Sequence, residues 1–233
     1  MNHLLSPRLF QCAKLVAHGD RVADVGCDHG YLGIYLLQNE IASFVYAGDV
    51  NEGPLQSAVL NAKRYGGNDK ISFYLSDGVK NMPRDFDTLV CAGMGADTMI
   101  SVLEAAPWLQ DSRYRMILQC QSKIHILRKY LSENGWRISS ETVLRDGRFL
   151  YTVMEILYQP GCTLTPGQWY FPPALLHQAT PALHEYYQQV IFRLERAVTG
   201  QKENADPIMV QALTELKSDS SLQFLKEEYH DNG

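Results

Sequence analysis

Short apolar runs alternate with helical patterns along the first two thirds of the chain. Runs rich in β-branched residues predict five strands, at residues 21–25, 43–49, 71–75, 88–91 and 116–119. Apolar positions at three- and four-residue steps predict helices at residues 31–39, 52–65, 97–105 and 123–134. This alternation favours an α/β fold in which helices cover both faces of a mostly parallel sheet.

Two longer strand-like runs follow, at residues 136–144 and 149–157, joined by Arg145-Asp146-Gly147-Arg148. An Asp-Gly pair between two such runs is a hairpin signal. A hairpin strand must run opposite to its partner, so we expect the sheet to finish with an antiparallel strand.

The pattern changes after residue 158. Three Pro-Gly or Pro-Pro pairs between residues 160 and 173 predict a linker. Apolar stripes at helical spacing over residues 176–197 and 209–225 then predict an antiparallel helical hairpin, with Thr180-Pro181 as a helix start. We therefore expect two domains, residues 1–158 and 159–233. The alternative is that the hairpin only packs on the sheet domain.

Composition places the 233-residue chain among ordinary globular proteins, with 45% hydrophobic and 20% charged residues. No apolar stretch approaches the roughly 18 residues that cross a bilayer, and the N-terminus lacks the pattern of a secretory signal. The five cysteines are scattered without a C-x-x-C pair. This favours free thiols over disulfides or a zinc site. We expect a cytoplasmic protein without a metal ion.

The net charge of −5 is unevenly distributed. Residues 1–159 carry 16 basic and 17 acidic side chains, and residues 160–233 carry 5 and 9. Because the acidic excess lies in the tail, a local basic surface in the first part of the chain remains compatible with the total. Charge alone does not decide whether the partner is a nucleic acid.

A glycine-rich loop, D-V-G-C-D-H-G-Y-L-G at residues 24–33, lies between the first strand and its helix. Dinucleotide-binding loops read G-x-G-x-x-G and hold a pyrophosphate. Here Asp28 replaces the middle glycine and Asp24 stands two residues before Gly26. Two carboxylates would repel a pyrophosphate but attract an ammonium and a sulfonium. The loop therefore favours S-adenosylmethionine (SAM).

Two further acids stand at strand ends. Asp49 ends the second strand, where it can accept hydrogen bonds from ribose hydroxyls, and Asp77 follows the third, within reach of an adenine amino group. Each acid alone could be a loop turn or a helix cap, and Asp49 alone would also suit NAD. Acids at successive strand ends together favour a SAM site.

Four segments resemble the bacterial tRNA adenine-N1 methyltransferases that modify adenine 22. These segments are D-V-G-C-D-H-G-Y-L (24–32), D-V-N-E-G-P-L (49–55), S-D-G (76–78) and A-G-M-G (92–95). The resemblance covers roughly residues 4–158 and departs from the usual pattern at Gly33, Ala96 and Cys120-Gln121. It implies a Rossmann-like class I methyltransferase fold, a C-terminal helical, coiled-coil-like domain, SAM as cofactor and tRNA as partner.

The cofactor residues that we expect come from the strand-end segments. They are Asp24, Gly26, Asp28, His29, Gly30, Tyr31, Asp49, Val50, Asn51, Asp77, Gly78, Ala92, Gly93, Met94 and Gly95.

Adenine N1 has a lone pair and no proton, so methylation there needs no general base. Holding the reacting atoms in line can supply most of the rate enhancement. The D/N-P-P-aromatic motif typical of enzymes that methylate exocyclic amines is absent from residues 92–95. Asp28 is a candidate for stabilising the cationic product electrostatically. The alternative, which the residues favour, is that Asp28 only contacts the cofactor or caps the helix.

N1 lies on the Watson–Crick edge, so the target base must leave its pair before it can react. His29, Tyr31 and Met94 are candidates to line its pocket, although His29 could instead be solvent-exposed. Basic side chains that could contact tRNA phosphates are Arg8, Lys14, Arg113, Arg115, Lys123, His125, Arg128, Lys129, Arg145, Arg148, Arg193, Arg196 and Lys202. Scattered surface cations are the alternative explanation.

Other functions remain open from sequence alone. The chain could methylate another RNA or a small molecule, or bind SAM or RNA without catalysis. An NAD(P) oxidoreductase is disfavoured by the Asp24 and Asp28 pair. The sequence does not determine the oligomeric state.

Overall fold

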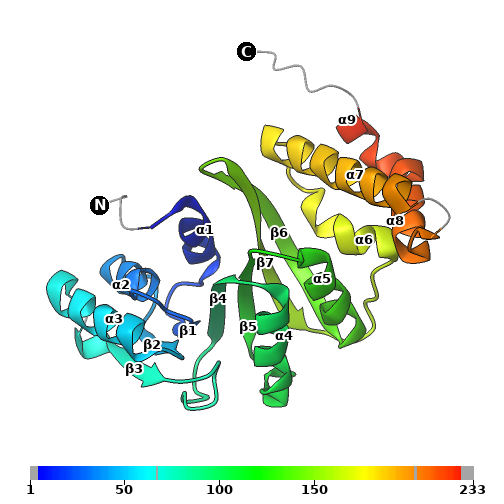
Figure 1. The fold of residues 1–233 in the computed structure, drawn as a ribbon. Coiled ribbons are helices and arrows are strands. Elements are labelled where there is room, and N and C mark those ends of the chain that lie inside the picture. The colour runs from blue at the N-terminus through cyan, green and yellow to red at the C-terminus, as the bar shows by residue number, and fades with distance from the viewer. Residues whose placement is uncertain (1–4, 67, 202–203, 227–233) are drawn as a thin grey trace.

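A seven-stranded sheet forms the centre of the computed structural model, which describes residues 5–66, 68–201 and 204–226 (Figure 1). The strands lie in the order β3-β2-β1-β4-β5-β7-β6. They are β1 (Arg21–Val25), β2 (Phe44–Asp49), β3 (Ile71–Leu75), β4 (Thr88–Met94), β5 (Arg115–Cys120), β6 (Trp136–Asp146) and β7 (Phe149–Tyr158). The first five strands pair in parallel, and β7 runs antiparallel to both β5 and β6. The predicted mostly parallel sheet with an antiparallel last strand is confirmed.

Helices cover both faces of this sheet because alternate residues of each buried strand point to opposite sides. On one face Val22, Val90 and Ile117 pack against three helices, and on the other Leu89 and Met116 pack against two. The first three helices are α1 (Pro7–Leu15), α2 (Tyr31–Gln38) and α3 (Glu52–Tyr65). The other two are α4 (Ala96–Glu104) and α5 (Ile124–Glu133), and the short turns η1 (Asn68–Lys70) and η2 (Pro107–Leu109) lie in connections.

The sequence patterns did not predict α1. Ser6 caps this helix, its hydroxyl accepting from the N–H of Leu9 at 3.5 Å, and Pro7 occupies the first helical turn. A serine followed by proline is a helix-start signal that was available in the sequence. Cys12 and Ala13 are buried against the sheet, so α1 belongs to the same core as α2 and α3.

The predicted linker at residues 160–173 was wrong in part. This stretch contains α6 (Pro166–Tyr170), and η3 (Pro173–Leu175) follows directly. Thr165 and Gln168 form a capping box around the start of α6. Both prolines stand at first helical positions, where proline is tolerated because its missing N–H would have no partner in the helix. They therefore begin short helices instead of interrupting the chain.

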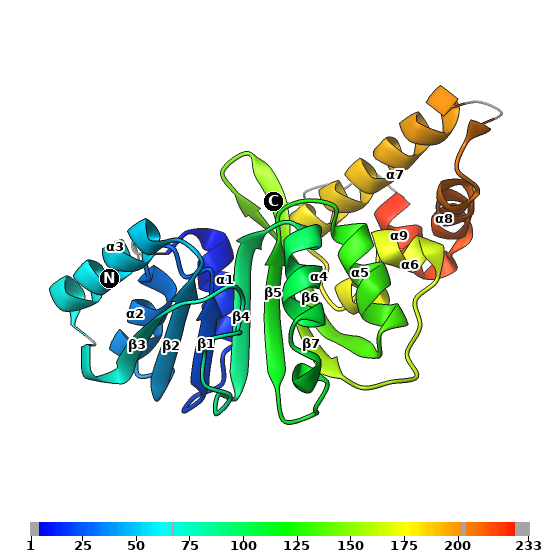
Figure 2. The same ribbon diagram turned by 60° about the horizontal axis from the view of Figure 1, so that its bottom comes forward.

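The predicted C-terminal helical hairpin is present as α7 (Pro181–Gln201) and α8 (Pro207–Ser218), followed by η5 (Ser220–Leu222) and α9 (Gln223–Lys226). Thr180 caps α7, as predicted, by accepting from the N–H of Leu183 at 3.2 Å. These helices share a third core with Val143 of β6 and gather beside β6 and α5 (Figures 1 and 2). No helix in the described ranges is long and apolar enough to cross a membrane.

Candidate active site

The loop between β1 and α2 forms a tight turn over the end of the sheet. Gly26 and Gly30 both have φ of +72°, and Asp28 between them has φ of +51°. Residues with a side chain rarely adopt this left-handed backbone conformation, whereas glycine adopts it readily. The N–H groups of Gly26 and Cys27 donate to the carbonyl of Gly48 at 2.8 and 2.9 Å. The loop is therefore attached to the neighbouring strand β2.

Asp49 ends β2 and holds the same loop through its side chain. Its carboxylate is buried, and it accepts from the backbone N–H of Asp28 at 3.1 Å and of Asn51 at 2.9 Å. These two bonds use different oxygens, and each carboxylate oxygen can accept a second bond. Asp49 also borders a cavity. It can thus position the loop and still accept hydrogen bonds from a ligand.

Asp24 lies on β1 and is only 4% exposed. Its Oδ2 is buried without a hydrogen-bond partner among the described residues. Burial, and to a smaller extent the negative charge of Asp49, raises the pKa of the Asp24 carboxyl to about 7. Because an unpaired buried acceptor costs free energy, the site favours a ligand that brings a donor or a positive charge to Asp24.

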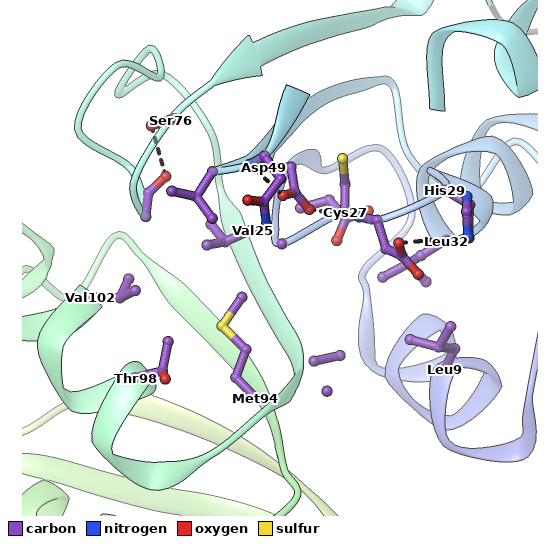
Figure 3. A pocket seen from close by; sticks show the side chains of 18 of the residues that line it. Leu9, Val25, Cys27, His29, Leu32, Asp49, Ser76, Met94, Thr98 and Val102 are labelled. Carbon is purple, nitrogen blue, oxygen red and sulfur yellow. Dashed lines mark hydrogen bonds and ion pairs between the residues drawn. The ribbon is translucent and has the colours of Figure 1, made fainter. Parts of the chain in front are cut away.

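A cavity of about 410 Å³ lies at the carboxyl ends of these strands, within the size range of small-molecule sites (Figure 3). In Figure 3, Asp49 and Met94 face this space from opposite sides, and Thr98 and Val102 of α4 border it. The predicted cofactor residues that line it are Asp24, Gly26, Asp28, His29, Tyr31, Asp49, Val50, Asn51, Asp77, Gly78, Ala92, Gly93 and Met94.

Two predicted cofactor residues, Gly30 and Gly95, lie outside this lining. A Cβ on Gly30 would approach Ala58 of α3 to 2.9 Å, and a Cβ on Gly95 would approach Ser122 Oγ to 2.9 Å. Both glycines therefore permit close packing behind the cavity. Ala96, where the family resemblance departs, is 1% exposed in the core and does not border the cavity.

Gln119, near the end of β5, supports Gly93 in the cavity wall and carries no motif that predicted this role. Gln119 is fully buried, and its Oε1 accepts from the N–H of Gly93 at 3.1 Å and from Arg8 Nη1 at 3.3 Å. A buried glutamine at a strand end was the available signal. Other wall residues that we did not predict are Leu9, Val25, Cys27, Leu32, Ser76, Thr98, Val102 and Gln121.

Arg8 of α1 lines the cavity directly, although the sequence analysis placed it among the tRNA contacts. Its Nε lies 3.4 Å from Asp146 Oδ2 at the tip of the β6–β7 hairpin. The guanidinium is therefore held by both Gln119 and Asp146. It adds a positive charge to a wall whose acidic residues are Asp24, Asp28, Asp49 and Asp77.

The three candidates for the target-base pocket all border the same cavity. His29 is half exposed, with its Nε2 3.7 Å from Asp28 Oδ1, and its ring centroid lies 6.0 Å from that of Tyr31. A Cβ placed on Gly26 would lie 2.1 Å from Met94 Cε. Met94 therefore occupies the space that a side chain at Gly26 would fill.

Arg128 was wrongly predicted as a phosphate contact. Its side chain is fully buried and forms an ion pair with the buried Glu141 at 2.6 Å. It also donates to the carbonyls of Trp169 and Tyr170 of α6 at 3.1 and 2.8 Å, and to the hydroxyl of Tyr186 of α7 at 3.2 Å. Arg128 thus joins the sheet domain to the C-terminal helices.

Arg115 was also wrongly placed among the phosphate contacts. It forms ion pairs with Asp20 at 2.7 Å and Glu155 at 3.4 Å. Arg113 precedes it and lies near Asp111. Both arginines lie at or just before the amino end of β5, whereas the cavity borders the carboxyl ends of the parallel strands. They are therefore at the opposite end of the strands from the cavity.

The other predicted basic contacts are accessible or partly buried. Lys14 is exposed at the end of α1, and Arg148 stacks on Phe149 at the hairpin tip. Lys123 pairs with Asp97 at 2.8 Å, and Arg145 pairs with Glu185. His125 and Lys129 lie on α5, Arg193 and Arg196 are exposed on α7, and Lys202 lies outside the described residues. Across the described ranges, no three potential ligand side chains gather to hold a metal ion.

A family model described as a methyltransferase domain matches residues 5–154. The match includes every residue that lines the cavity. The chain belongs to this methyltransferase family.

The chain aligns with part of the length of its curated relatives. A Bacillus subtilis protein named tRNA (adenine(22)-N(1))-methyltransferase is 32% identical over 156 residues, which cover 66% of this chain and 66% of that protein. A Mycoplasma genitalium relative is 32% identical over 138 residues and is covered to 61%. The chain spans less than two thirds of the length of these relatives.

Solved structures extend the likeness to the C-terminal helices. The crystal structure of the B. subtilis m1A22 tRNA methyltransferase TrmK has 26% identity and a TM-score of 0.77, and the superposition covers 95% of this methyltransferase and 97% of TrmK. A Streptococcus pneumoniae protein in complex with S-adenosyl-L-methionine has 28% identity and a TM-score of 0.80, covering 91% and 98%. The tail therefore has structural counterparts in both proteins.

Proposed function

We propose that this methyltransferase transfers a methyl group from SAM to N1 of an adenine in tRNA, with adenine 22 as the expected position. The observation that supports this proposal most directly is the cavity at the strand ends, which is lined by acidic residues. The B. subtilis relative, named for this reaction, supports the choice of substrate. The A-G-M-G segment at residues 92–95 supports the same reaction, because it lacks the motif of exocyclic-amine methylation.

The cavity wall suits SAM better than a dinucleotide. The unpaired Oδ2 of Asp24 can accept from the cofactor's ammonium group, and Arg8 can bind its carboxylate. The free acceptor capacity of Asp49 suits the ribose hydroxyls, and Asp77 suits the adenine amino group. Two carboxylates beside a pyrophosphate would be repulsive, so the same residues disfavour NAD. When bound, SAM supplies an electrophilic methyl group on a sulfonium.

The residues of this chain need only position the target base, since N1 is already nucleophilic. Met94 and Gly93 end β4 beside the loop of β1, and the N–H of Gln121 donates to the carbonyl of Met94 at 2.8 Å. Gln119 holds the N–H of Gly93. These bonds keep the A-G-M-G segment rigid, which favours an in-line approach. Asp28 borders the cavity and can stabilise the positive charge that the base gains.

We also propose that the protein is cytoplasmic. Cys12, Cys27, Cys91 and Cys120 are buried free thiols, and Cys162 is exposed and free. Unpaired thiols of this kind are typical of a reducing compartment, where tRNA is also found.

Incubation with methyl-labelled SAM and unmodified tRNA tests the proposal. The tRNA is then digested, and the labelled nucleoside is identified and mapped. We expect 1-methyladenosine at position 22, and no label in a tRNA with guanine there. Label on an exocyclic amine or on a small molecule would contradict the proposed reaction.

A further inference from the structure

A second cavity of about 340 Å³ is lined by residues of α5, α6, α7 and α8 and by Lys123, which precedes α5. Figures 1 and 2 show these four helices gathered on one side of the sheet. Aromatic and aliphatic side chains form most of its wall, which includes Tyr170, Tyr186 and Ala197. Two basic residues, Lys123 and Arg193, also line it, one from the sheet domain and one from the C-terminal helices. The cavity thus combines an apolar wall with a cationic rim.

This cavity adjoins the candidate active site along the chain. Gln121 lines the active-site cavity and Lys123 lines the second one. Two residues of chain span at most about 7 Å. Lys123 has φ of +56°, an uncommon conformation for a residue with a side chain, and the N–H of Gln121 is bonded to Met94. The turn between the two cavities is therefore fixed to the target-base side of the active site.

Two rings of the wall form an aromatic pair. His125 and Tyr170 are stacked, with ring centroids 4.6 Å apart and planes inclined by 9°. Burial, and to a smaller extent the positive charge of Arg128, lowers the pKa of His125. A neutral imidazole stacked on a phenol is an apolar surface, comparable to the aromatic platforms that bind unpaired bases.

The charged rim suits an anion next to such a base. Lys123 Nζ lies 2.8 Å from Asp97, so part of its charge is compensated. Arg193 donates to the neutral Gln189 at 3.0 Å and is exposed. Because residues 160–233 carry 5 basic and 9 acidic side chains, a polyanion can approach the tail favourably only where cations are locally placed. Arg193 provides such a local positive charge.

We infer that this cavity binds a nucleotide of the tRNA strand next to the target adenine, with its base against the apolar wall and its phosphate at Arg193. A strand whose target base enters the first cavity passes the turn at residues 121–123 and reaches the second. The inference rests on the proposed function, and it gives the C-terminal helices a specific role in substrate binding.

Two variants test the cavity independently of each other. Ala197→Trp fills the space and keeps all charges, and Arg193→Ala removes the cation and leaves the space. Lys217→Ala is the matched control, since Lys217 is exposed on α8, pairs with Glu195, lies outside the cavity lining and is not among the predicted tRNA contacts. Initial rates of methyl transfer to unmodified tRNA give KM, calorimetry gives the Kd for SAM, and circular dichroism checks folding.

We expect both cavity variants to raise the KM for tRNA about tenfold, the effect of losing one stacked base or phosphate contact. The control should change it less than about twofold, and the Kd for SAM should stay constant in all three. An unchanged KM for tRNA in a folded Arg193→Ala variant would overturn the inference. In that case, methylation of tRNA by the wild-type chain would still support the proposed function. Equal rises in KM in the Arg193 and Lys217 variants would also overturn it, because they would show an effect of diffuse surface charge. A wild-type chain that methylates no tRNA would refute the proposed function itself.

Discussion

Asp49 performs two tasks with one carboxylate, holding the β1 loop and facing the cavity. Asp49→Ala should therefore raise the Kd for SAM at least about tenfold, because two or more hydrogen bonds worth about 1 kcal/mol each are lost. Titration calorimetry measures this directly. Asp111→Ala is the matched control and should leave the Kd unchanged, because Asp111 is exposed and lies before the amino end of β5, away from the cavity. An unchanged Kd in Asp49→Ala would refute the placement of the ribose.

Asp24 predicts a pH dependence of cofactor binding. The pKa of its carboxyl is raised from 3.8 to about 7 by burial and by Asp49, so the proton must leave before the carboxylate can attract a cation. SAM affinity should rise as the pH increases from about 6 to about 8. In Asp24→Asn the affinity should be lower at pH 8 and should lose most of this dependence. A wild-type affinity that is constant over the same range would contradict this role.

The same shift has a consequence for the stability of the ligand-free protein. The folded pKa lies above the unfolded one, so the folded state holds the proton more tightly. Asp24 therefore stabilises the fold fully below about pH 4, and this contribution is lost as the pH rises through about 7. A ligand that pairs with Asp24 offsets the loss, so SAM should stabilise the wild-type chain most at high pH.

At the level of elements, the sequence predicted the sheet well because its signals are local. The apolar runs of β1, β2, β4 and β5 are mostly buried, and Asp146-Gly147 lies at the turn between β6 and β7. The helix α1 was missed because only its Ser6-Pro7 start is distinctive. The linker prediction failed because proline pairs are compatible with both loops and helix starts. Local patterns do not distinguish these cases when packing decides between them.

The candidate site was predictable to a similar degree. Acids and glycines at strand ends are visible in sequence, and all of them except Gly30 and Gly95 border the cavity. Arg8 and Gln119 meet across 111 residues of chain, so their contact requires the fold. Arg128 was misplaced for a related reason. A basic residue on a predicted helix gives no sign of a buried carboxylate partner on another strand.

The Arg128–Glu141 pair predicts how α5, β6 and the tail depend on one another. Arg128→Ala should lower the free energy of unfolding by about 3–5 kcal/mol, because Glu141 would be left buried and uncompensated. Urea unfolding measures the loss. Replacing both residues, as Arg128→Met with Glu141→Leu, should restore much of the stability. Arg137→Ala, at an exposed arginine in the second position of β6, is the control and should change stability by less than about 0.5 kcal/mol. A single Arg128 variant as stable as the wild type would contradict the buried pair.

For the whole molecule, the two cavities differ in which parts of the chain line them. The active-site cavity is lined by residues between Arg8 and Gln121, and the described part of residues 159–233 contributes none of its lining. The second cavity is lined from both sides of residue 159. We therefore propose that residues 1–158 bind the cofactor and that residues 159–233 complete the tRNA site.

Deletion of residues 160–233 tests this division. The truncated chain loses the acceptors that α6 and α7 provide to Arg128, and it exposes Val143, so it should unfold at a lower temperature. The double replacement at Arg128 and Glu141, made in both the full and the truncated chain, removes the first of these effects. At a temperature where circular dichroism shows both chains folded, the Kd for SAM should agree within about twofold, and the rate of tRNA methylation should fall at least about tenfold. A truncated chain that does not fold would show that the two parts form one folding unit. One that methylates tRNA as fast as the full chain would show that the tail contributes packing alone.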